Sequence, residues 1–413
     1  MRIHVIGAGL AGLAAAWRMA EDGYAVTLYE AAPQAGGRCR SFLDLTLDRV
    51  VDNGGHVLLG ANRAALGLLR ATGGLSAMTE IAPAAFPFHD LSTGESWVLR
   101  PNAGPLPWWI FSKNRRVPGS QCGDYLTALS LLRAHDGATV TDCLKPSLLT
   151  TRLWEPLAVA VMNAPMSEAA ARPLGRTLLG VFGRGESSCR AWIANAGLSA
   201  AFVEPTLKRL NERGAEFRPG WRLARLEIGA DGANALIFDE ERVAIEPGER
   251  VVLAVPPSIA ADLLPGLTVP EGGNAIVNAH YRLERPVALP GGRPLLGLIG
   301  SNAQWLIARD DIVSVTVSGA DALVDRPAND LLDLLWSDVG RALGITTPRP
   351  AARLIKERRA TFAQTPENQR RRPPAATRYP NLFLAGDWTD TRLPATIEGA
   401  VRSGLVAARA AIR

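Results

Sequence analysis

Three glycines near the start of the chain and a carboxylate after them could bind the phosphates and a ribose of a dinucleotide. Gly7, Gly9 and Gly12 have the spacing that permits a tight turn, close approach of backbone to a pyrophosphate and close helix–strand packing. Glu30 lies roughly 20 residues further on, where a carboxylate can accept the hydroxyls of an adenosine ribose and would repel a 2′-phosphate. The predicted dinucleotide contacts are Gly7, Gly9, Leu10, Ala11, Gly12 and Glu30.

A strand, a helix and a second strand must position these residues. The apolar run 3–6 leads into the glycine turn, an alanine-rich segment follows, and the strand-like run 24–29 ends at Glu30. The helix start would offer unpaired N–H groups and a positive dipole end to the phosphates. A glycine turn alone also occurs where nothing binds, but this order of elements favours a dinucleotide site. It does not distinguish FAD from NAD, since both carry the same ADP half.

Two later motifs distinguish the cofactors. Gly36-Gly37-Arg38 follows Glu30 closely, and near the far end a short apolar strand from Asn381 delivers Gly386-Asp387. Together with the first turn, these motifs resemble the flavoproteins of the amine oxidase and phytoene desaturase superfamily, which implies FAD as the cofactor. In that superfamily the Gly-Gly-Arg loop lies along the pyrophosphate and flavin, and the late Gly-Asp pair holds ribityl and phosphate oxygens.

The resemblance also implies roles for residues that lie far apart in the chain. Gly54, Gly55 and His56 would lie beside the isoalloxazine, and Leu223 would meet adenine through its backbone. The helix that begins near Glu398 would direct its N-terminus at the flavin pyrimidine, where it would stabilise negative charge. The FAD contacts implied in this way are Gly36, Gly37, Arg38, Gly54, Gly55, His56, Leu223, Gly386, Asp387, Ile397, Glu398 and Ala400.

The implied fold is α/β (α+β), with a discontinuous nucleotide-binding domain. At 413 residues, two domains are expected. We predict a Rossmann-like FAD-binding domain of the amine oxidase type, formed by residues 1–75, 201–268 and 375–413. Residues 76–200 and 269–374 should form a second, mixed sheet-and-helix domain that covers the substrate. Within the first domain, the runs 215–218 and 221–227 are expected to pair as strands.

Four further stretches narrow the resemblance within the superfamily. They are residues 52–60, 277–280, 304–306, and 385–389 with the following 393–400. With them, the whole chain resembles the hydroxysqualene dehydroxylases of bacterial hopanoid biosynthesis, once described as squalene-associated FAD-dependent desaturases. The resemblance implies a reduction in which reduced flavin delivers hydride to hydroxysqualene, an allylic alcohol that loses water to leave squalene.

Such a reduction needs an acid or a hydrogen-bond donor for the departing hydroxyl. His56 follows the Gly-Gly turn and His280 lies on a strand of the expected substrate domain, so either could be the acid, with Asp52 as an orienter. His56 could equally shape its loop by bonding flavin or main chain, and His280 could be structural. The apolar stretches 157–161 and 295–299 would line a long dry tunnel, although they also fit an ordinary core.

Two other functions stay open. A carotenoid or phytoene-type desaturase would use the same fold and a similar polyisoprene with electrons moving the other way, and no residue sets the direction of hydride flow. A non-catalytic flavoprotein could instead bind lipid or an upstream synthase. No second glycine fingerprint marks a nicotinamide site, so the electron donor is expected to be NAD(P)H bound transiently at the flavin, or another redox protein.

Charge and cysteine usage indicate which kinds of partner and which cellular compartment to expect. The formal charge is only +5, and no concentrated basic face or reader motif points to nucleic acid. The arginine run 370–372 is expected to be a solvated connector. Four scattered cysteines indicate neither a zinc site nor a disulfide framework, which predicts no metal and a reduced, cytoplasmic location. From the residues we expect no leader peptide and no apolar stretch long enough to cross a bilayer.

One segment combines bulky apolar groups with cations. Residues 105–111 are apolar and aromatic and directly precede Lys113, Arg115 and Arg116, a combination typical of interfacial anchors. Two interpretations stay open. The segment could contact the inner face of the membrane peripherally, with hydroxysqualene or squalene as the hydrophobic isoprenoid ligand, or Trp108 and Trp109 could simply pack in the core of a cap.

Overall fold

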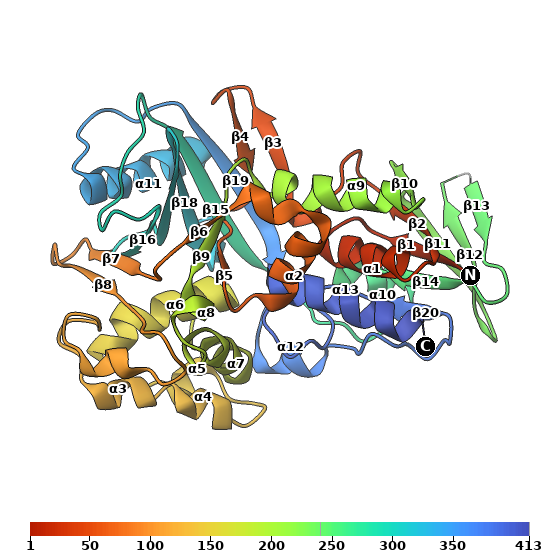
Figure 1. Cartoon of the computed structure of the whole chain (residues 1–413), viewed down its shortest axis with the longest axis horizontal. Helices are drawn as coiled ribbons and strands as arrows, with labels where there is room; N and C mark the ends of the chain where they lie inside the picture. Colours follow the sequence, from red (N-terminus) through yellow and green to blue (C-terminus); the bar gives the residue numbers. More distant parts are fainter. Residues whose placement is uncertain (240, 413) are drawn as a thin grey trace.

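A parallel five-stranded sheet carries the predicted dinucleotide turn. The computed structural model describes residues 1–239 and 241–412. Across the sheet the strands are β10 (Glu216–Pro219), β2 (Ala25–Glu30), β1 (Arg2–Ile6), β14 (Arg250–Leu253) and β20 (Leu382–Leu384). Every neighbouring pair is parallel, so all five carboxyl ends meet at one edge. Segments from the start, middle and end of the chain therefore lie side by side (Figure 1).

Small residues let two helices pack closely beside this sheet. In Figure 1, α1 (Leu10–Glu21) and α13 (Ile397–Ala411) run next to the parallel strands. A Cβ on Gly404 of α13 would lie only 2.1 Å from the Ala11 carbonyl oxygen of α1. The glycine in α13 thus permits an approach to the α1 backbone that a larger residue there would prevent.

A seven-stranded sheet forms the centre of the other half of the molecule. Its strands, in order, are β19 (Ala352–Thr361), β15 (Asn274–Arg282), β18 (Ile312–Ser318), β17 (Trp305–Arg309), β16 (Leu295–Ile299), β7 (Phe86–Asp90) and β8 (Ser96–Leu99). Only β16 and β7 run parallel to each other. Alternating apolar residues of β15 and β18 pack on α11 (Ala328–Leu343), which buries Leu335 and Trp336 there.

A layer of short helices, here named the cap layer, packs beneath this sheet in Figure 1. Aromatic rings form much of its core. The centroid of the Tyr125 ring lies 5.1 Å from that of Trp109 and 6.0 Å from that of Trp154. Among the described residues, no helix has the length and hydropathy to cross a membrane. The cap layer comprises η3 (Trp108–Phe111), α3 (Cys122–Leu126), α4 (Leu129–Arg133), α5 (Val140–Cys143), η4 (Thr150–Trp154), α6 (Glu155–Met162), α7 (Ala171–Phe182) and α8 (Glu186–Cys189).

The expected pairing of runs 215–218 and 221–227 is wrong. β10 joins β2 in parallel, while β11 (Leu223–Gly229) pairs antiparallel with β12 (Gly232–Phe238). The chain leaves the parallel sheet between these two strands because Gly220, at φ +79°, turns the backbone away. The Gly220 N–H donates to the Ala32 carbonyl oxygen at this turn. The remaining elements are η1 (Gly37–Cys39), β3 (Ser41–Asp44), β4 (Arg49–Asp52), β5 (Leu58–Leu59), α2 (Arg63–Thr72), η2 (Gly74–Ala77), β6 (Met78–Ile81), β9 (Ala191–Ala194), η5 (Ser199–Val203), α9 (Glu204–Glu212), β13 (Glu241–Ala244), α10 (Pro257–Leu263), η6 (Ala320–Ala322) and α12 (Pro366–Arg370).

Candidate active site

A cavity of about 1480 Å³ opens at the carboxyl edge of the five-stranded sheet and extends to the seven-stranded sheet and the cap layer. This edge is where open α/β sheets bind their ligands. Gly12 lies outside the cavity wall because it packs on the turn, where a Cβ would be 1.8 Å from the Gly7 carbonyl oxygen. The other predicted FAD contacts all line the cavity: Gly7, Gly9, Leu10, Ala11, Glu30, Gly36, Gly37, Arg38, Gly54, Gly55, His56, Leu223, Gly386, Asp387, Ile397, Glu398 and Ala400.

The first glycine turn has the geometry that phosphate binding requires. Gly7 has φ +101°, and a Cβ there would lie 2.5 Å from the Ala254 carbonyl oxygen, so only glycine fits. At Gly9 a Cβ would meet no atom within 4 Å, which leaves open space beside the backbone. Helix α1 begins at Leu10, so its unpaired N–H groups face this space.

Glu30 is held where it can meet a ribose. Its Oε2 accepts a hydrogen bond from the Ala8 N–H at 2.8 Å, and its Oε1 accepts one from the Ala32 N–H at 2.9 Å. These bonds fix the carboxylate at the end of β2 while leaving each oxygen a second lone pair. The fixed carboxylate can therefore accept hydroxyl hydrogens from a ligand in the cavity.

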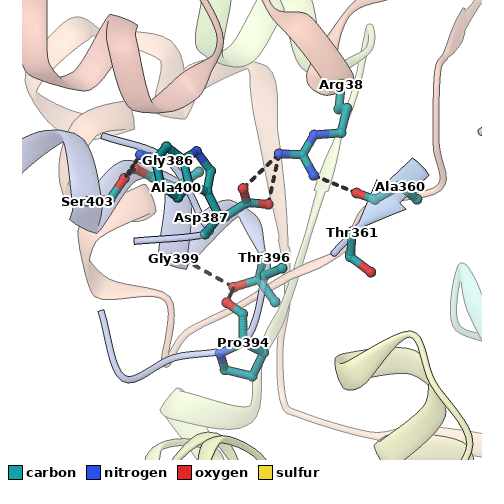
Figure 2. A network of polar contacts seen from close by, with 12 residues as sticks. Arg38, Ala360, Thr361, Gly386, Asp387, Pro394, Thr396, Gly399, Ala400 and Ser403 are labelled. Carbon is teal, nitrogen blue, oxygen red and sulfur yellow. Dashed lines mark hydrogen bonds and ion pairs between the residues drawn. The ribbon is translucent and has the colours of Figure 1, made fainter. Parts of the chain in front are cut away.

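Arg38 and Asp387 form the ion pair at the centre of Figure 2. The Arg38 Nη2 atom lies 2.8 Å from both Asp387 carboxylate oxygens, and the charge of Asp387 raises the pKa of Arg38. Arg38 Nη1 also donates to the Ala360 carbonyl oxygen at the end of β19. The pair thus connects the Gly-Gly-Arg motif to the Gly-Asp motif, and Arg38 connects both to the seven-stranded sheet.

The start of α13 is ordered by its own cap and by α2. Thr396 Oγ1 accepts from the Gly399 N–H at 3.2 Å (Figure 2), so this N–H serves the cap. The Glu398 carboxylate accepts from the N–H groups of Ala64 and Ala65 at 3.0 and 2.9 Å, and its burial raises the pKa of Glu398. The Glu398 side chain therefore joins two helices, and only the surrounding backbone remains to meet a ligand.

His56 lines the cavity as a neutral imidazole. Its Nδ1 lies 2.9 Å from the Gly54 carbonyl oxygen, which can only accept, so Nδ1 carries the ring hydrogen. Burial lowers the pKa of His56, which keeps the ring neutral at pH 7. The remaining nitrogen, Nε2, is then an acceptor.

Within the described part of the chain, neither His280 nor Asp52 lines the cavity. His280 Nε2 donates to the Asp52 carbonyl oxygen at 3.1 Å and Nδ1 accepts from Ser314 Oγ at 2.7 Å, so both ring nitrogens are engaged. Burial lowers the pKa of His280 to about 4. The Asp52 carboxylate accepts from Arg309 and from the Leu198 N–H, so it orients neither imidazole ring.

Comparison with known proteins identifies the chain. Residues 10–412 match the family described as flavin containing amine oxidoreductase. The hydroxysqualene dehydroxylase of Sinorhizobium fredii is 42% identical over 411 residues, which cover 99% of this chain and 98% of that protein. The enzyme of the same name from Rhodopseudomonas palustris is 43% identical over 404 residues, which cover 97% and 96% of the two chains. The chain belongs to the hydroxysqualene dehydroxylase family.

The predicted fold class is confirmed by this family and by a solved structure. Cyclohexylamine oxidase from Brevibacterium oxydans superposes with a TM-score of 0.71 at 16% identity, covering 100% of this chain and 98% of that one. The match extends over both sheets and the cap layer. The division of the chain into domains at particular residues stays a prediction.

This member of the hydroxysqualene dehydroxylase family is an FAD-dependent oxidoreductase, and its cavity fits FAD. The open space at Gly9 and the N-terminus of α1 suit the pyrophosphate, the fixed Glu30 carboxylate suits the ribose, and Arg38 with Asp387 extends the polar wall. Beyond Arg38, the polar part of the wall continues to the N-terminus of α13. All of these residues line the same cavity.

Arg372 lies behind the cavity wall, and the expectation that it is solvated is wrong. Its side chain is buried, and its guanidinium donates to the carbonyl oxygens of Thr389, Leu393 and Asp387. Burial lowers the pKa of Arg372 to about 10. It thus fixes the loop that follows the Gly-Asp motif. The adjacent arginines masked this role, because a run of like charges is typical of a solvated segment.

Asn278 is a second residue that sequence reasoning quoted without giving it a role. Its Oδ1 accepts from the Gly55 N–H at 3.1 Å and from Thr316 Oγ1 at 2.9 Å. A Cβ on Gly55 would lie 2.4 Å from that Thr316 oxygen, so the glycine lets the loop rest directly on the sheet. The position of His56 therefore depends on the strands β15 and β18.

Proposed function

We propose that this chain reduces hydroxysqualene to squalene, with loss of water, inside the cavity. Reduced FAD supplies both hydrogens of the reaction, one as hydride to the carbinol carbon and one as the proton that leaves with the oxygen. The observation that carries the proposal is the identity of 42% and 43% with named hydroxysqualene dehydroxylases over nearly the whole chain. The single cavity that joins FAD-site residues to an apolar wall supports it.

The apolar wall suits a long hydrocarbon chain. It lies beyond the Arg38–Asp387 pair and combines residues from the cap layer with strands of the seven-stranded sheet. Such a wall excludes water and favours the isoprenoid through burial of apolar area. Its members include Phe86, Leu157, Ala160, Val161, Leu295, Trp305 and Ile307.

We propose different roles for the three predicted catalytic residues, His56, His280 and Asp52. His56 faces the cavity and can accept a hydrogen bond through Nε2, which would orient the substrate or flavin. His280 and Asp52 support the site from behind, because the His280 ring joins the Asp52 backbone to Ser314 of β18. Since burial keeps both imidazoles neutral, neither carries the second ring proton that an acid would give at pH 7.

The proposal extends to two partners. The electron donor is NAD(P)H or a redox protein, because the reduced cofactor must be regenerated after each turnover. The protein is cytoplasmic and binds the inner face of a membrane peripherally through η3, where Trp108 and Phe111 are exposed close to Lys113 and Arg115. A membrane is also where a substrate of this polarity would concentrate.

An anaerobic single turnover tests the reaction. The purified flavoprotein is photoreduced, mixed with detergent-solubilised hydroxysqualene, and followed by flavin absorbance while products are extracted for mass spectrometry. We expect oxidised flavin and squalene in equal amounts. A carotenoid-type desaturase would instead leave the reduced flavin unchanged, while its oxidised form would be bleached by a more saturated polyisoprene. A flavoprotein that only binds lipid would show neither change.

A further inference from the structure

The departing oxygen of the substrate needs a hydrogen-bond donor that neither histidine provides. A hydroxide-like leaving group gains most from a fixed donor aimed at the place where its charge develops. The free nitrogen of His56 is an acceptor, and both nitrogens of His280 are engaged. The donor must therefore come from another polar group in the cavity wall.

Thr361 is such a group, and it lies at the cofactor end of the cavity. It is the last residue of β19, directly after Ala360, whose carbonyl oxygen accepts from Arg38 (Figure 2). The ion pair between Arg38 and Asp387 therefore fixes the strand next to Thr361. The Thr361 residue is 7% exposed and lines the cavity.

A hydrogen bond from Asn163 leaves the Thr361 hydroxyl hydrogen free to be donated. The Asn163 Nδ2 donates to Thr361 Oγ1 at 3.0 Å and to the Asn274 carbonyl oxygen at 3.0 Å. An amide N–H can only donate, so the Thr361 oxygen accepts in this bond and its own hydrogen remains. Within the described part of the chain, that hydroxyl accepts this bond and donates none. A hydroxyl that is nine-tenths buried and retains an unused hydrogen beside a cavity indicates a ligand acceptor there.

The orientation of Asn163 is itself fixed. Asn163 ends α6 in the left-handed conformation, with φ +49°, and is 2% exposed. Its Oδ1 accepts from the Gly319 N–H at 2.7 Å, so the amide cannot rotate to exchange its oxygen and nitrogen. Because Leu157, Ala160 and Val161 of the same helix line the apolar wall, the donor stands between that wall and the cofactor residues.

We propose that Thr361 donates its hydroxyl hydrogen to the carbinol oxygen of the polyisoprenoid alcohol, with Asn163 as the positioning residue, an inference that rests on the proposed function. In the balanced step the carbinol C–O bond breaks and a C–H bond forms with the hydride supplied by the cofactor, so two electrons pass to carbon. The oxygen leaves as water with the second hydrogen that the reduced cofactor releases. Thr361 keeps its own proton and stabilises the charge that develops on the oxygen.

Ligand binding to the oxidised holoenzyme tests the hydrogen bond without turnover. Wild-type protein should bind hydroxysqualene about two- to twelve-fold more tightly than squalene, as one net hydrogen bond provides. Thr361→Val should remove this preference while leaving the affinity for squalene unchanged, and Thr361→Ser should keep it. Asn163→Asp should also remove it, because the aspartate would accept the Thr361 hydrogen and turn it away from the cavity. Flavin content and melting temperature confirm that each variant folds.

Single-turnover rates at saturating hydroxysqualene complete the test. We expect Thr361→Val and Asn163→Asp to slow flavin oxidation by about a hundred-fold, as the loss of one such donor does elsewhere, and Thr361→Ser to stay within a few-fold of wild type. Folded variants that all retain the wild-type rate and binding preference would overturn the role of Thr361 but leave the proposed function standing. Absence of squalene from the wild-type reaction would instead overturn the proposed function itself.

Discussion

At the scale of single residues, His56 and His280 are both neutral but differ in which ring atoms stay free. His56 uses only Nδ1, on Gly54, while His280 uses both nitrogens, on Asp52 and Ser314. Burial is the main cause of the lowered pKa in both cases. A ring with one free nitrogen can meet a ligand, whereas a ring with both engaged can only hold neighbouring segments together.

The buried state of His280 predicts how stability depends on pH. Its pKa falls from 6.5 to about 4 on folding, so between these values the unfolded chain binds more protons than the folded one. The free energy of unfolding should therefore decrease as pH falls from 6.5 towards 4, with this residue contributing about 3 kcal/mol. Urea unfolding of wild type and His280→Gln over this range measures the effect. The variant should show the shallower pH dependence, and equal slopes would contradict the prediction.

At the scale of elements, η3 divides one apolar run between the interior and the surface. Trp109 and Ile110 are buried, and Trp109 packs on Tyr125 and Phe182 in the cap layer. Trp108 and Phe111 are 63% and 62% exposed and pack on each other. The core interpretation of this segment therefore holds for Trp109, and only the outward pair is available to a membrane.

Replacing that outward pair should weaken membrane binding without unfolding the protein. We expect Trp108→Ser with Phe111→Ser to reduce cosedimentation with vesicles that contain anionic lipid, because the apolar contribution beside the cations is lost. The matched control is Leu43→Ser with Leu45→Ser, which removes two exposed apolar residues, 58% and 88% exposed, from the β3–β4 hairpin. Equal binding by both folded double variants would argue against η3 as the contact.

At the scale of the whole molecule, the cavity depends on both sheets and the cap layer. The five-stranded sheet provides the glycine turn, while β15, β18 and β19 provide the opposite wall. The Arg38–Asp387 pair and the bond from Arg38 to Ala360 connect the two sides. A ligand that fills this cavity contacts both halves, so its binding should stabilise the molecule as a unit.

Gly9→Val tests this dependence on the cofactor. The new side chain starts in open space, so the chain should fold, but the branched group would occupy the room for the pyrophosphate. We expect purified protein without FAD, a lower melting temperature, and faster hydrogen exchange in residues 386–397 but not in α11. Gly123→Val of α3, another glycine without close neighbours and outside the cavity wall, should retain FAD. Stoichiometric FAD in Gly9→Val would contradict the placement of the pyrophosphate.

The sequence alone predicted the glycine turn and its acid because their signals are local. The turn from Gly7 to Gly12 and the acid at Glu30 lie within one strand–helix–strand unit, where spacing along the chain fixes spacing in the fold. The later motifs at Arg38 and Asp387 were located by resemblance and do line the same cavity. Arg372 was misjudged because its partners are carbonyl oxygens, which every residue possesses and no sequence pattern reveals.

Only the tertiary structure decided which polar groups of the cap layer and the seven-stranded sheet reach the cavity. Asn163 and Thr361 stand 198 positions apart, on a cap helix and a sheet strand, and nothing in either local sequence predicts their contact. The same holds for His280, which meets Asp52 across 228 positions and is thereby withdrawn from the cavity. The physical reason is that hydrogen-bond donors and acceptors acquire their roles from the neighbours that folding brings to them, whereas a turn carries its geometry in its own residues.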